Sequence, residues 1–145
     1  MRIIIVNGPN LNLIGQREEE IYGSASFASY LDSLKQRKDV VIDYFQSNVE
    51  GELINCLQGS GHDGIILNAG GYTHTSVALS DCVKAIDVPV VEVHISNIAA
   101  REPFRHTSLI SPGAIGCIFG FGLEGYALAL DYFIHYFNRR ETSVD

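Results

Sequence analysis

The stretch RIIIVNGPNLNLIGQREEEIYG, residues 2–23, begins as a short apolar run and continues as a long polar segment. An unbroken run of Ile and Val is typical of a parallel strand that is buried on both faces. Connections to the next element usually take about two to six residues, and the polar segment is roughly three times that long. We therefore expect the segment to carry function as well as to connect two elements.

Four more apolar runs follow, and segments of helical period separate them. The alternation predicts an α/β fold in a single domain, residues 1–145, with one long insertion after the fourth strand. Right-handed crossovers favour a flavodoxin-like three-layer sandwich, with a five-stranded parallel sheet of order 2-1-3-4-5. A capping box, Ser47 to Glu50, marks the start of the second helix. The expected strands are residues 2–6, 40–45, 64–67, 88–93 and 114–119.

The composition indicates which kinds of partner and which cellular compartment to expect. The chain has 145 residues and a net charge of −7 with only ten Lys and Arg, which argues against a nucleic-acid partner. Cys56, Cys82 and Cys117 are widely spaced in apolar surroundings and indicate buried thiols in a reducing compartment. Neither a signal peptide nor a membrane-spanning run is expected. The sequence therefore favours a cytoplasmic protein without a membrane partner.

Polar residues gather after the first, third and fourth expected strands. In open α/β sheets, ligands bind outside the carboxyl ends of the strands, at the point where the strand order reverses. For the order 2-1-3-4-5 that point lies between the first and third strands. Fold and polar residues therefore predict one and the same site.

The first polar segment carries a candidate base. Gly15 and Gly23 bracket a polar stretch, as in a mobile lid. Within it, Arg17 and Tyr22 are five residues apart, and a nearby cation lowers the pKa of a tyrosine. Tyr22 is then a candidate general base, whereas a solvated charged loop is the alternative interpretation.

The segment after the third strand, residues 68–76 (NAGGYTHTS), places Asn68 and His74 on either side of two glycines. Adjacent glycines let a ligand approach the backbone closely. A helix that begins near Thr75 or Ser76 would also turn free N–H groups toward the ligand. The alternative is a helix cap preceded by a simple turn.

After the fourth strand, His94 ends an apolar run and Glu92 lies two residues earlier, on the same face. A carboxylate that orients and charges an imidazole favours general acid–base chemistry. Arg101 and Arg105 are four residues apart, so one helical turn would align them toward an anion. The alternatives are a structural histidine and a solvated pair of arginines.

Other chemistries are less well supported. Residues 120–125 (GFGLEG) match a dinucleotide-binding fingerprint, but no strand follows the helix after them, so tight strand-to-helix packing explains these glycines better. Lys35, Lys38 and Lys84 lie on expected helices away from strand ends, which disfavours a Schiff base. No cluster has metal-ligand spacing in the sequence. We expect acid–base chemistry that needs neither metal nor cofactor.

Taken together, these motifs resemble those of the type II 3-dehydroquinate dehydratases, also called type II dehydroquinases. The resemblance covers nearly the whole chain, and the motifs occur in the same order. The matching segments are residues 7–13 (NGPNLNL), 15–18 (GQRE), 22–23 (YG), 68–76 (NAGGYTHTS), 92–97 (EVHISN) and 101–105 (REPFR).

The resemblance implies a hydro-lyase that converts 3-dehydroquinate to 3-dehydroshikimate by anti elimination through an enolate, in the shikimate pathway or in quinate catabolism. It implies that Tyr22 is the base and that Arg17 keeps Tyr22 ionised. Asn10 would position a water at the enolate oxygen. His94, oriented by Glu92, would protonate the departing hydroxyl.

For binding, the resemblance implies that the backbone N–H groups of Ile95 and Ser96 hold the substrate carboxylate. Asn68, His74 and Arg105 would hold the ring and its hydroxyls.

The resemblance also implies an assembly. Asp81 matches a residue that reaches the site of a neighbouring subunit, and the family forms dodecamers built as tetramers of trimers. A large homo-oligomer is therefore expected.

Two other classes of function stay open at this point. One is a flavodoxin-like binding module that has kept the fold without catalysis, and the other is an NAD- or FMN-dependent enzyme. Arg17, Tyr22 and His94 favour the dehydratase, since a binding module needs neither a base nor an acid.

Overall fold

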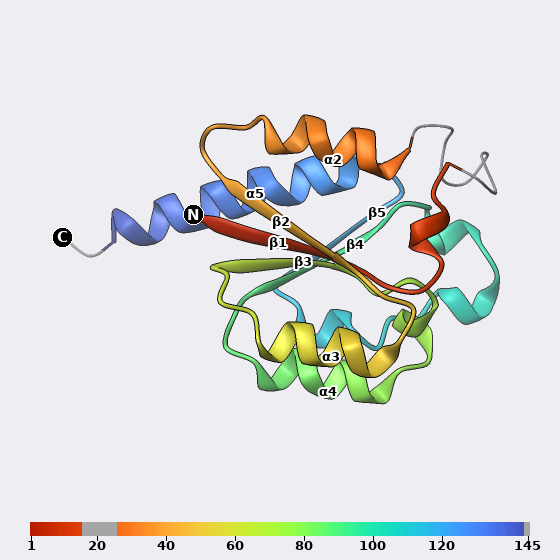
Figure 1. Cartoon of the computed structure of the whole chain (residues 1–145). Helices are drawn as coiled ribbons and strands as arrows, with labels where there is room; N and C mark the ends of the chain where they lie inside the picture. Colours follow the sequence, from red (N-terminus) through yellow and green to blue (C-terminus); the bar gives the residue numbers. More distant parts are fainter. Residues whose placement is uncertain (16–25, 144–145) are drawn as a thin grey trace.

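The computed structural model describes residues 1–15 and 26–143. In this part of the chain, five parallel strands form one sheet of order β2-β1-β3-β4-β5 (Figure 1), which confirms the predicted topology. The strands are β1 (Arg2–Asn7), β2 (Val41–Gln46), β3 (Gly64–Asn68), β4 (Val90–His94) and β5 (Gly116–Phe119).

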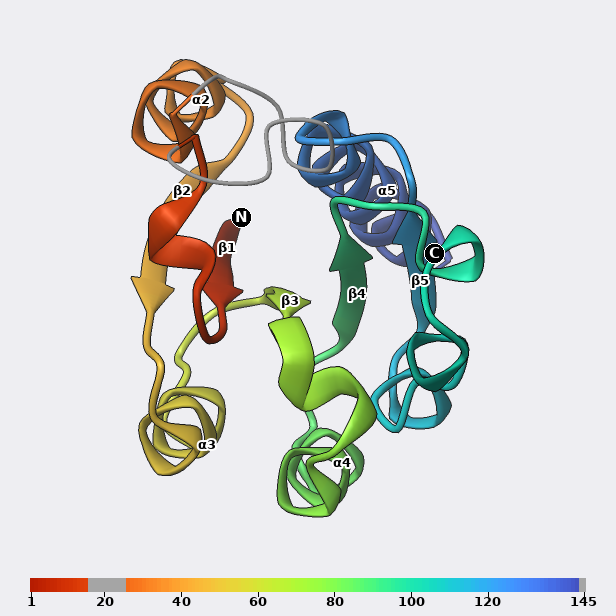
Figure 2. The same ribbon diagram turned by 90° about the vertical axis from the view of Figure 1, so that its right-hand side faces the viewer.

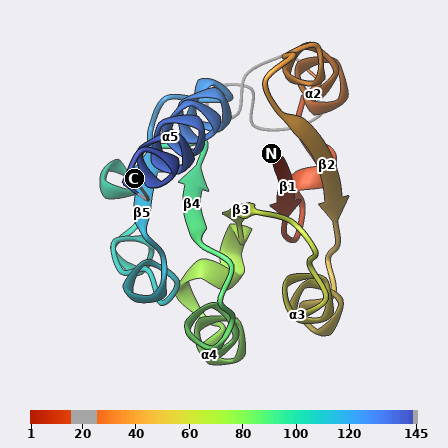
Figure 3. The same ribbon diagram turned by 90° about the vertical axis from the view of Figure 1, so that its left-hand side faces the viewer.

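Helices cover both faces of the sheet, so the fold has three layers. Seen from either end of the strands, two helices lie on one face and two on the other (Figures 2 and 3). The first pair is α2 (Phe27–Lys35) and α5 (Glu124–Glu141), and the second pair is α3 (Glu50–Gln58) and α4 (Val77–Ala85). None of the helices in the described residues combines the length and the hydropathy needed to cross a bilayer.

The opening strand is apolar throughout because each face of the sheet has its own core. Ile3 and Ile5 pack in the layer of α2 and α5. Ile4 and Val6 pack in the layer of α3 and α4. Successive side chains of a strand point to opposite faces, so a strand between two helical layers needs apolar residues at every position.

The long insertion that the sequence predicted after the fourth strand is the connection between β4 and β5. Within residues 95–115, all of them described, there is no α-helix but three 3₁₀ turns: η3 (Ile98–Ala100), η4 (Pro103–Arg105) and η5 (Ser111–Gly113). Both η4 and η5 carry a proline in their first turn. Proline is tolerated there but cannot continue a preceding helix, so the segment breaks into short turns.

The sequence predicted a capping box between Ser47 and Glu50, but Glu50 is not the glutamate that Ser47 contacts. Ser47 Oγ accepts the backbone N–H of Val49 at 2.9 Å and donates to the carboxylate of Glu52, not of Glu50. The helix begins at Glu50, with Val49 as its cap residue, so Ser47 lies two residues too early to be the cap. Glu52 occupies the third helical position, where a capping carboxylate belongs.

The cysteines differ in their surroundings. Cys82 is buried and Cys56 is half-buried, as the sequence suggested, but Cys117 is exposed. Its strand, β5, lies at the edge of the sheet, where an apolar sequence neighbourhood does not ensure burial.

A close backbone contact joins the ends of β1 and β3. The N–H of Gly8 donates to the carbonyl oxygen of Asn68 at 2.7 Å. A Cβ at Gly8 would lie 2.5 Å from the carbonyl oxygen of Ala69, which is backbone and cannot move aside easily. Glycine at this position lets the two loops that leave the central strands run against each other.

We therefore expect Gly8→Ala to lower the free energy of unfolding by about 1–3 kcal/mol, because the added methyl group overlaps fixed backbone. Urea unfolding of both proteins measures the change. The matched control is Gly51→Ala on α3, where nothing lies within 4 Å of the added Cβ. There alanine should raise the stability by up to about 1 kcal/mol through its helix propensity. Equal stability of wild type and Gly8→Ala would contradict the proposed contact.

Candidate active site

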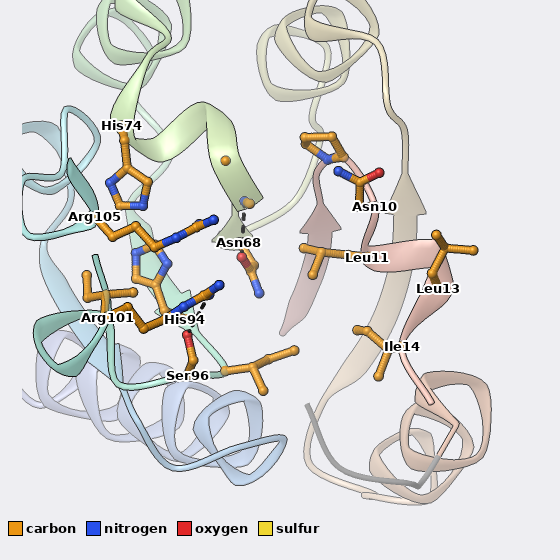
Figure 4. A pocket seen from close by; sticks show the side chains of 15 residues that line it. Asn10, Leu11, Leu13, Ile14, Asn68, His74, His94, Ser96, Arg101 and Arg105 are labelled. Carbon is orange, nitrogen blue, oxygen red and sulfur yellow. Dashed lines mark hydrogen bonds between the residues drawn. The ribbon is translucent and has the colours of Figure 1, made fainter. Parts of the chain in front are cut away.

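A cavity of about 150 Å³ lies at the carboxyl ends of β1, β3 and β4. One wall is the segment after β1, residues 9–14, which includes η1 (Leu11–Leu13). The opposite wall carries His74, His94, Arg101 and Arg105 (Figure 4). The cavity lies where the strand order reverses, as the fold predicts.

Two arginines give the cavity a positive wall. Arg101 donates from Nη1 to Ser96 Oγ at 3.2 Å, and Arg105 donates from Nε to Glu102 at 2.7 Å. Arg101 and Arg105 do not share the expected single helical turn, because Arg101 has extended backbone between η3 and η4. Both side chains reach the cavity all the same. In a protein of net charge −7, these two guanidinium groups make the cavity suited to an anion.

His74 is fixed by a single hydrogen bond. Its Nδ1 lies 2.8 Å from the carbonyl oxygen of Thr107. A carbonyl only accepts, so Nδ1 carries the proton and Nε2 is left for a ligand. The ring lies nearly parallel to that of His94, with 6.4 Å between the centroids.

Glu92 and His94 form a buried pair at the end of β4. Nε2 of His94 lies 2.9 Å from Oε1 of Glu92, and the Glu92 side chain is fully buried. Burial alone would raise the pKa of Glu92, but hydrogen bonds from His94, Ser108 and Ser111 outweigh it and lower that pKa to about 2. The strand thus presents an imidazole to the cavity with a fixed negative charge behind it.

Beneath the cavity, a buried network ties the ends of β1 and β3 to α5. The hydroxyl of Tyr126 donates to Asn7 Oδ1 at 2.8 Å and accepts from Asn68 Nδ2 at 2.9 Å. Asn68 Oδ1 in turn accepts the backbone N–H of Gly70 at 3.2 Å. These bonds fix the amide of Asn68, which forms part of the cavity floor.

Asn10 stands on the wall opposite the histidines (Figure 4). Its backbone is left-handed, with φ of 68°, a conformation that asparagine tolerates better than most residues. The backbone N–H of Asn10 donates to Asn48 Oδ1 at 3.0 Å, which anchors the segment to the loop after β2.

Comparison with known proteins bears directly on this arrangement. The family model described as "Dehydroquinase class II" matches residues 1–134. The chain belongs to the class II dehydroquinase family. A relative from Fusobacterium nucleatum, named 3-dehydroquinate dehydratase, is 51% identical over 96% of this chain and 100% of its own length. This chain is therefore an enzyme of the type II family.

Solved structures of the family share the fold. The type II dehydroquinase from Butyrivibrio crossotus superposes with a TM-score of 0.86 at 40% identity, covering 91% of this chain and 96% of its own. The type II dehydroquinase from Propionibacterium acnes gives a TM-score of 0.88 at 34% identity, covering 92% and 96%.

Most of the site residues expected by resemblance to the dehydroquinases line one cavity. They are Asn10, Asn68, His74, His94, Ile95, Ser96 and Arg105, with Glu92 behind His94. Asp81 does not reach the cavity of its own chain, since it lies exposed on α4. Arg17 and Tyr22 lie outside the described residues.

Some expectations about this dehydroquinase site need correction. The start of α4 does not face the cavity, because the 3₁₀ turn η2 (Gly70–His74) intervenes and lines it instead. Ser76 does cap α4, accepting the N–H of Leu79 at 2.9 Å. The sequence offered no sign of Tyr126 as a polar group, since Tyr126 fits the apolar face of the last helix. The spacing of Arg101 and Arg105 suggested that both face an anion, but the resemblance assigned only Arg105 to substrate binding; both line the cavity.

A cluster with metal-ligand chemistry also emerges, although none was expected from the sequence. Ligand atoms of Glu92, His94 and Cys117 lie within 4.8 Å of one another. Pairing of β4 with β5 brings them together, which linear spacing cannot reveal. Hydrogen bonds already occupy both Glu92 oxygens. Although Cys117 is exposed as a residue, desolvation of its thiol and the neighbouring Glu92 raise the pKa of Cys117 to about 12, which keeps the thiol protonated. Both features oppose metal ligation.

We expect Tyr126→Phe to destabilise the fold by about 1–3 kcal/mol, because the change leaves Asn7 Oδ1 and Asn68 Nδ2 buried with one partner fewer. Urea unfolding provides the measurement. Tyr132→Phe serves as the control, since it removes the same hydroxyl from an exposed position on the same helix. If both variants unfold like wild type, the network does not stabilise the site.

Proposed function

We propose that this enzyme dehydrates 3-dehydroquinate to 3-dehydroshikimate by anti elimination through an enolate. The observation that carries the proposal is the membership of a dehydroquinase family, combined with a cavity that sets a carboxylate–histidine pair beside two arginines. The reaction belongs to the shikimate pathway of aromatic amino-acid biosynthesis, or to quinate catabolism.

The first step needs a base. Tyr22, ionised beside Arg17, removes a proton from the carbon next to the ketone, and the electron pair moves to the ketone oxygen as an enolate. Asn10 positions a water that donates to this oxygen. Stabilising the enolate is the main requirement, because the α-proton is acidic only while that charge is held.

The second step needs an acid on the other side of the ring. As the enolate collapses, the carbon–oxygen bond of the hydroxyl breaks, and His94 supplies the proton that lets it leave as water. Nε2 is bonded to Glu92, so Nδ1 is the atom that gives the proton. Asn10 and His94 stand on opposite walls, which supports removal of the proton and the hydroxyl from opposite faces.

Substrate binding uses the residues that line the cavity. The backbone N–H groups of Ile95 and Ser96 hold the substrate carboxylate, while Asn68, His74 and Arg105 hold the ring and its hydroxyls. All five line the cavity, which supports this assignment. No metal or cofactor takes part in the proposed steps.

The enzyme acts as a homo-oligomer, a dodecamer built as a tetramer of trimers, with Asp81 reaching a neighbouring subunit's site. Support comes from the exposed edge strand β5 and the large apolar side chains exposed near it, since such edges usually find a partner. In sequence, the exposed apolar side chains in or beside this strand are Ile115, Phe119 and Phe121. Residues 1–145 form one dehydroquinase domain, and we place the protein in the cytoplasm.

The test of the reaction mixes purified protein with 3-dehydroquinate, without added metal or cofactor, and follows the ultraviolet absorbance of the conjugated enone product. An increase in absorbance that depends on the enzyme supports the proposal. Binding without turnover, measured by calorimetry, would favour a binding module. A bound flavin chromophore would favour a redox enzyme.

We expect Tyr22→Phe to lower kcat by a factor of at least about 10², the usual contribution of a general base, while the substrate still binds. Steady-state kinetics and calorimetry measure the two quantities. Tyr132→Phe, on α5 and outside the residues that line the cavity, is the matched control. A kcat for Tyr22→Phe close to that of wild type would mean that another group is the base.

Light scattering tests the assembly. The mass in solution should be twelve times the chain mass of 15.9 kDa. A monomer with full activity would rule out a dodecamer as the working form.

A further inference from the structure

We propose that Ser108 and Ser111 are positioning residues for catalysis: they hold the Glu92 carboxylate in its ionised form, and thereby hold His94 as a proton donor. The proposal rests on the proposed function, since it assumes that His94 supplies the proton. Neither serine lines the cavity, so both act through Glu92 and not on the substrate.

The contacts around Glu92 leave no gap for solvent. Oε1 accepts from Nε2 of His94 and from the hydroxyl of Ser108, and Oε2 accepts from the hydroxyl of Ser111. The side chain is fully buried. A buried carboxylate stays charged only where donors replace the water that it has lost. The two serines supply two of the three donors.

Hydrogen bonds fix the direction in which the hydroxyl of Ser108 donates its proton. Its oxygen accepts the backbone N–H groups of Ile110 and of Ser111, each at 3.1 Å. Because those bonds occupy the lone pairs of a hydroxyl, its single proton is left to point at Glu92. The turn that holds the serine thus fixes the proton as well as the oxygen.

The segment that carries both serines is itself anchored. The N–H of Leu109 donates to the carbonyl of Thr73 at 2.8 Å, and that of Ile115 donates to the carbonyl of Val90 at 2.8 Å. Ile110 is fully buried between them. The serine donors are therefore preorganised by contacts to η2 and β4, which lets them favour one charge state without rearrangement.

The side chains that face Glu92 determine how its negative charge is stabilised. The titratable side chains grouped with it among the described residues are His94 on β4 and Cys117 on β5. The thiol is neutral, since burial and Glu92 raise its pKa to about 12. Within this cluster, the imidazole of His94 is therefore the group that faces the charge of Glu92. Without the serines, the carboxylate keeps fewer hydrogen-bond donors and is a less well-fixed acceptor for the Nε2–H of His94, so His94 is a poorer proton donor to the substrate.

The first test is kinetic. In the intact enzyme, Ser108→Ala and Ser111→Ala should each lower kcat about tenfold or more, with KM changed little, since hydrogen bonds to charged groups are the strong ones. Ser→Thr at either position keeps the hydroxyl and should restore most of the rate. Ser80→Ala, a buried serine of α4 without a bond to Glu92, is the control and should retain the wild-type rate.

A double-mutant cycle separates this role from a general structural one. In a Glu92→Gln background, Ser111→Ala should cost less than twofold in kcat, because the charge through which the serine acts is gone. Equal costs in both backgrounds would overturn the proposal. If wild type itself gives no turnover, the proposed function has failed. If wild type is active and the alanine variants match it, only the serine proposal has failed.

Acid unfolding provides a readout independent of activity. The pKa of Glu92 is lowered from 4.5 to about 2, so its ionised form stabilises the fold above pH 4.5, and this contribution is lost as the pH falls toward 2. The difference in melting temperature between wild type and the double alanine variant should therefore narrow over that range. A difference independent of pH would indicate lost packing and would overturn the proposal.

Discussion

The pairing of β1 between β2 and β3, with helices on both faces, is the constraint on which the site depends. It buries the strand on both sides and requires apolar residues along its length. Where β1 and β3 end, the segments that follow them lead to helices on opposite faces of the sheet, and polar residues lie between them at the carboxyl edge (Figure 2). The cavity is thus a consequence of strand order, and its location would be kept under most changes of side chain.

Polar side chains at this edge are buried, and hydrogen bonds to specific partners offset the cost of removing them from water. Asn7, directly opposite Asn68 in the sheet, shares the hydroxyl of Tyr126 with it. Glu92, deeper in the sheet, has two serines and a histidine. An unpaired group of either kind would destabilise the fold by about 1–3 kcal/mol or more, so folding and positioning of the site rest on the same bonds.

The sequence predicted the sheet order and the location of the site because apolar periodicity and strand-end polarity are local signals. Asn68, His74 and His94 could be named from their places after strands. Contacts between distant segments were not visible: Tyr126 is 58 residues from Asn68, and Ser111 is 19 from Glu92. Cys117 was missed as a neighbour of Glu92 for the same reason. The four-residue spacing of Arg101 and Arg105 predicted one shared helical turn, whereas the structure has extended backbone at Arg101 and a proline at the start of η4.

The proposed acid and base are held by different kinds of structure. His94 ends a strand, its carboxylate partner is locked by three donors, and the loop that carries two of those donors is anchored to η2 and β4. Tyr22 and Arg17 belong to the long segment after β1, whose described part is joined to the loop after β2 by the hydrogen bond from Asn10 to Asn48. Donors that are fixed in the scaffold orient Glu92 and His94 before substrate arrives, so these groups need not rearrange during the reaction.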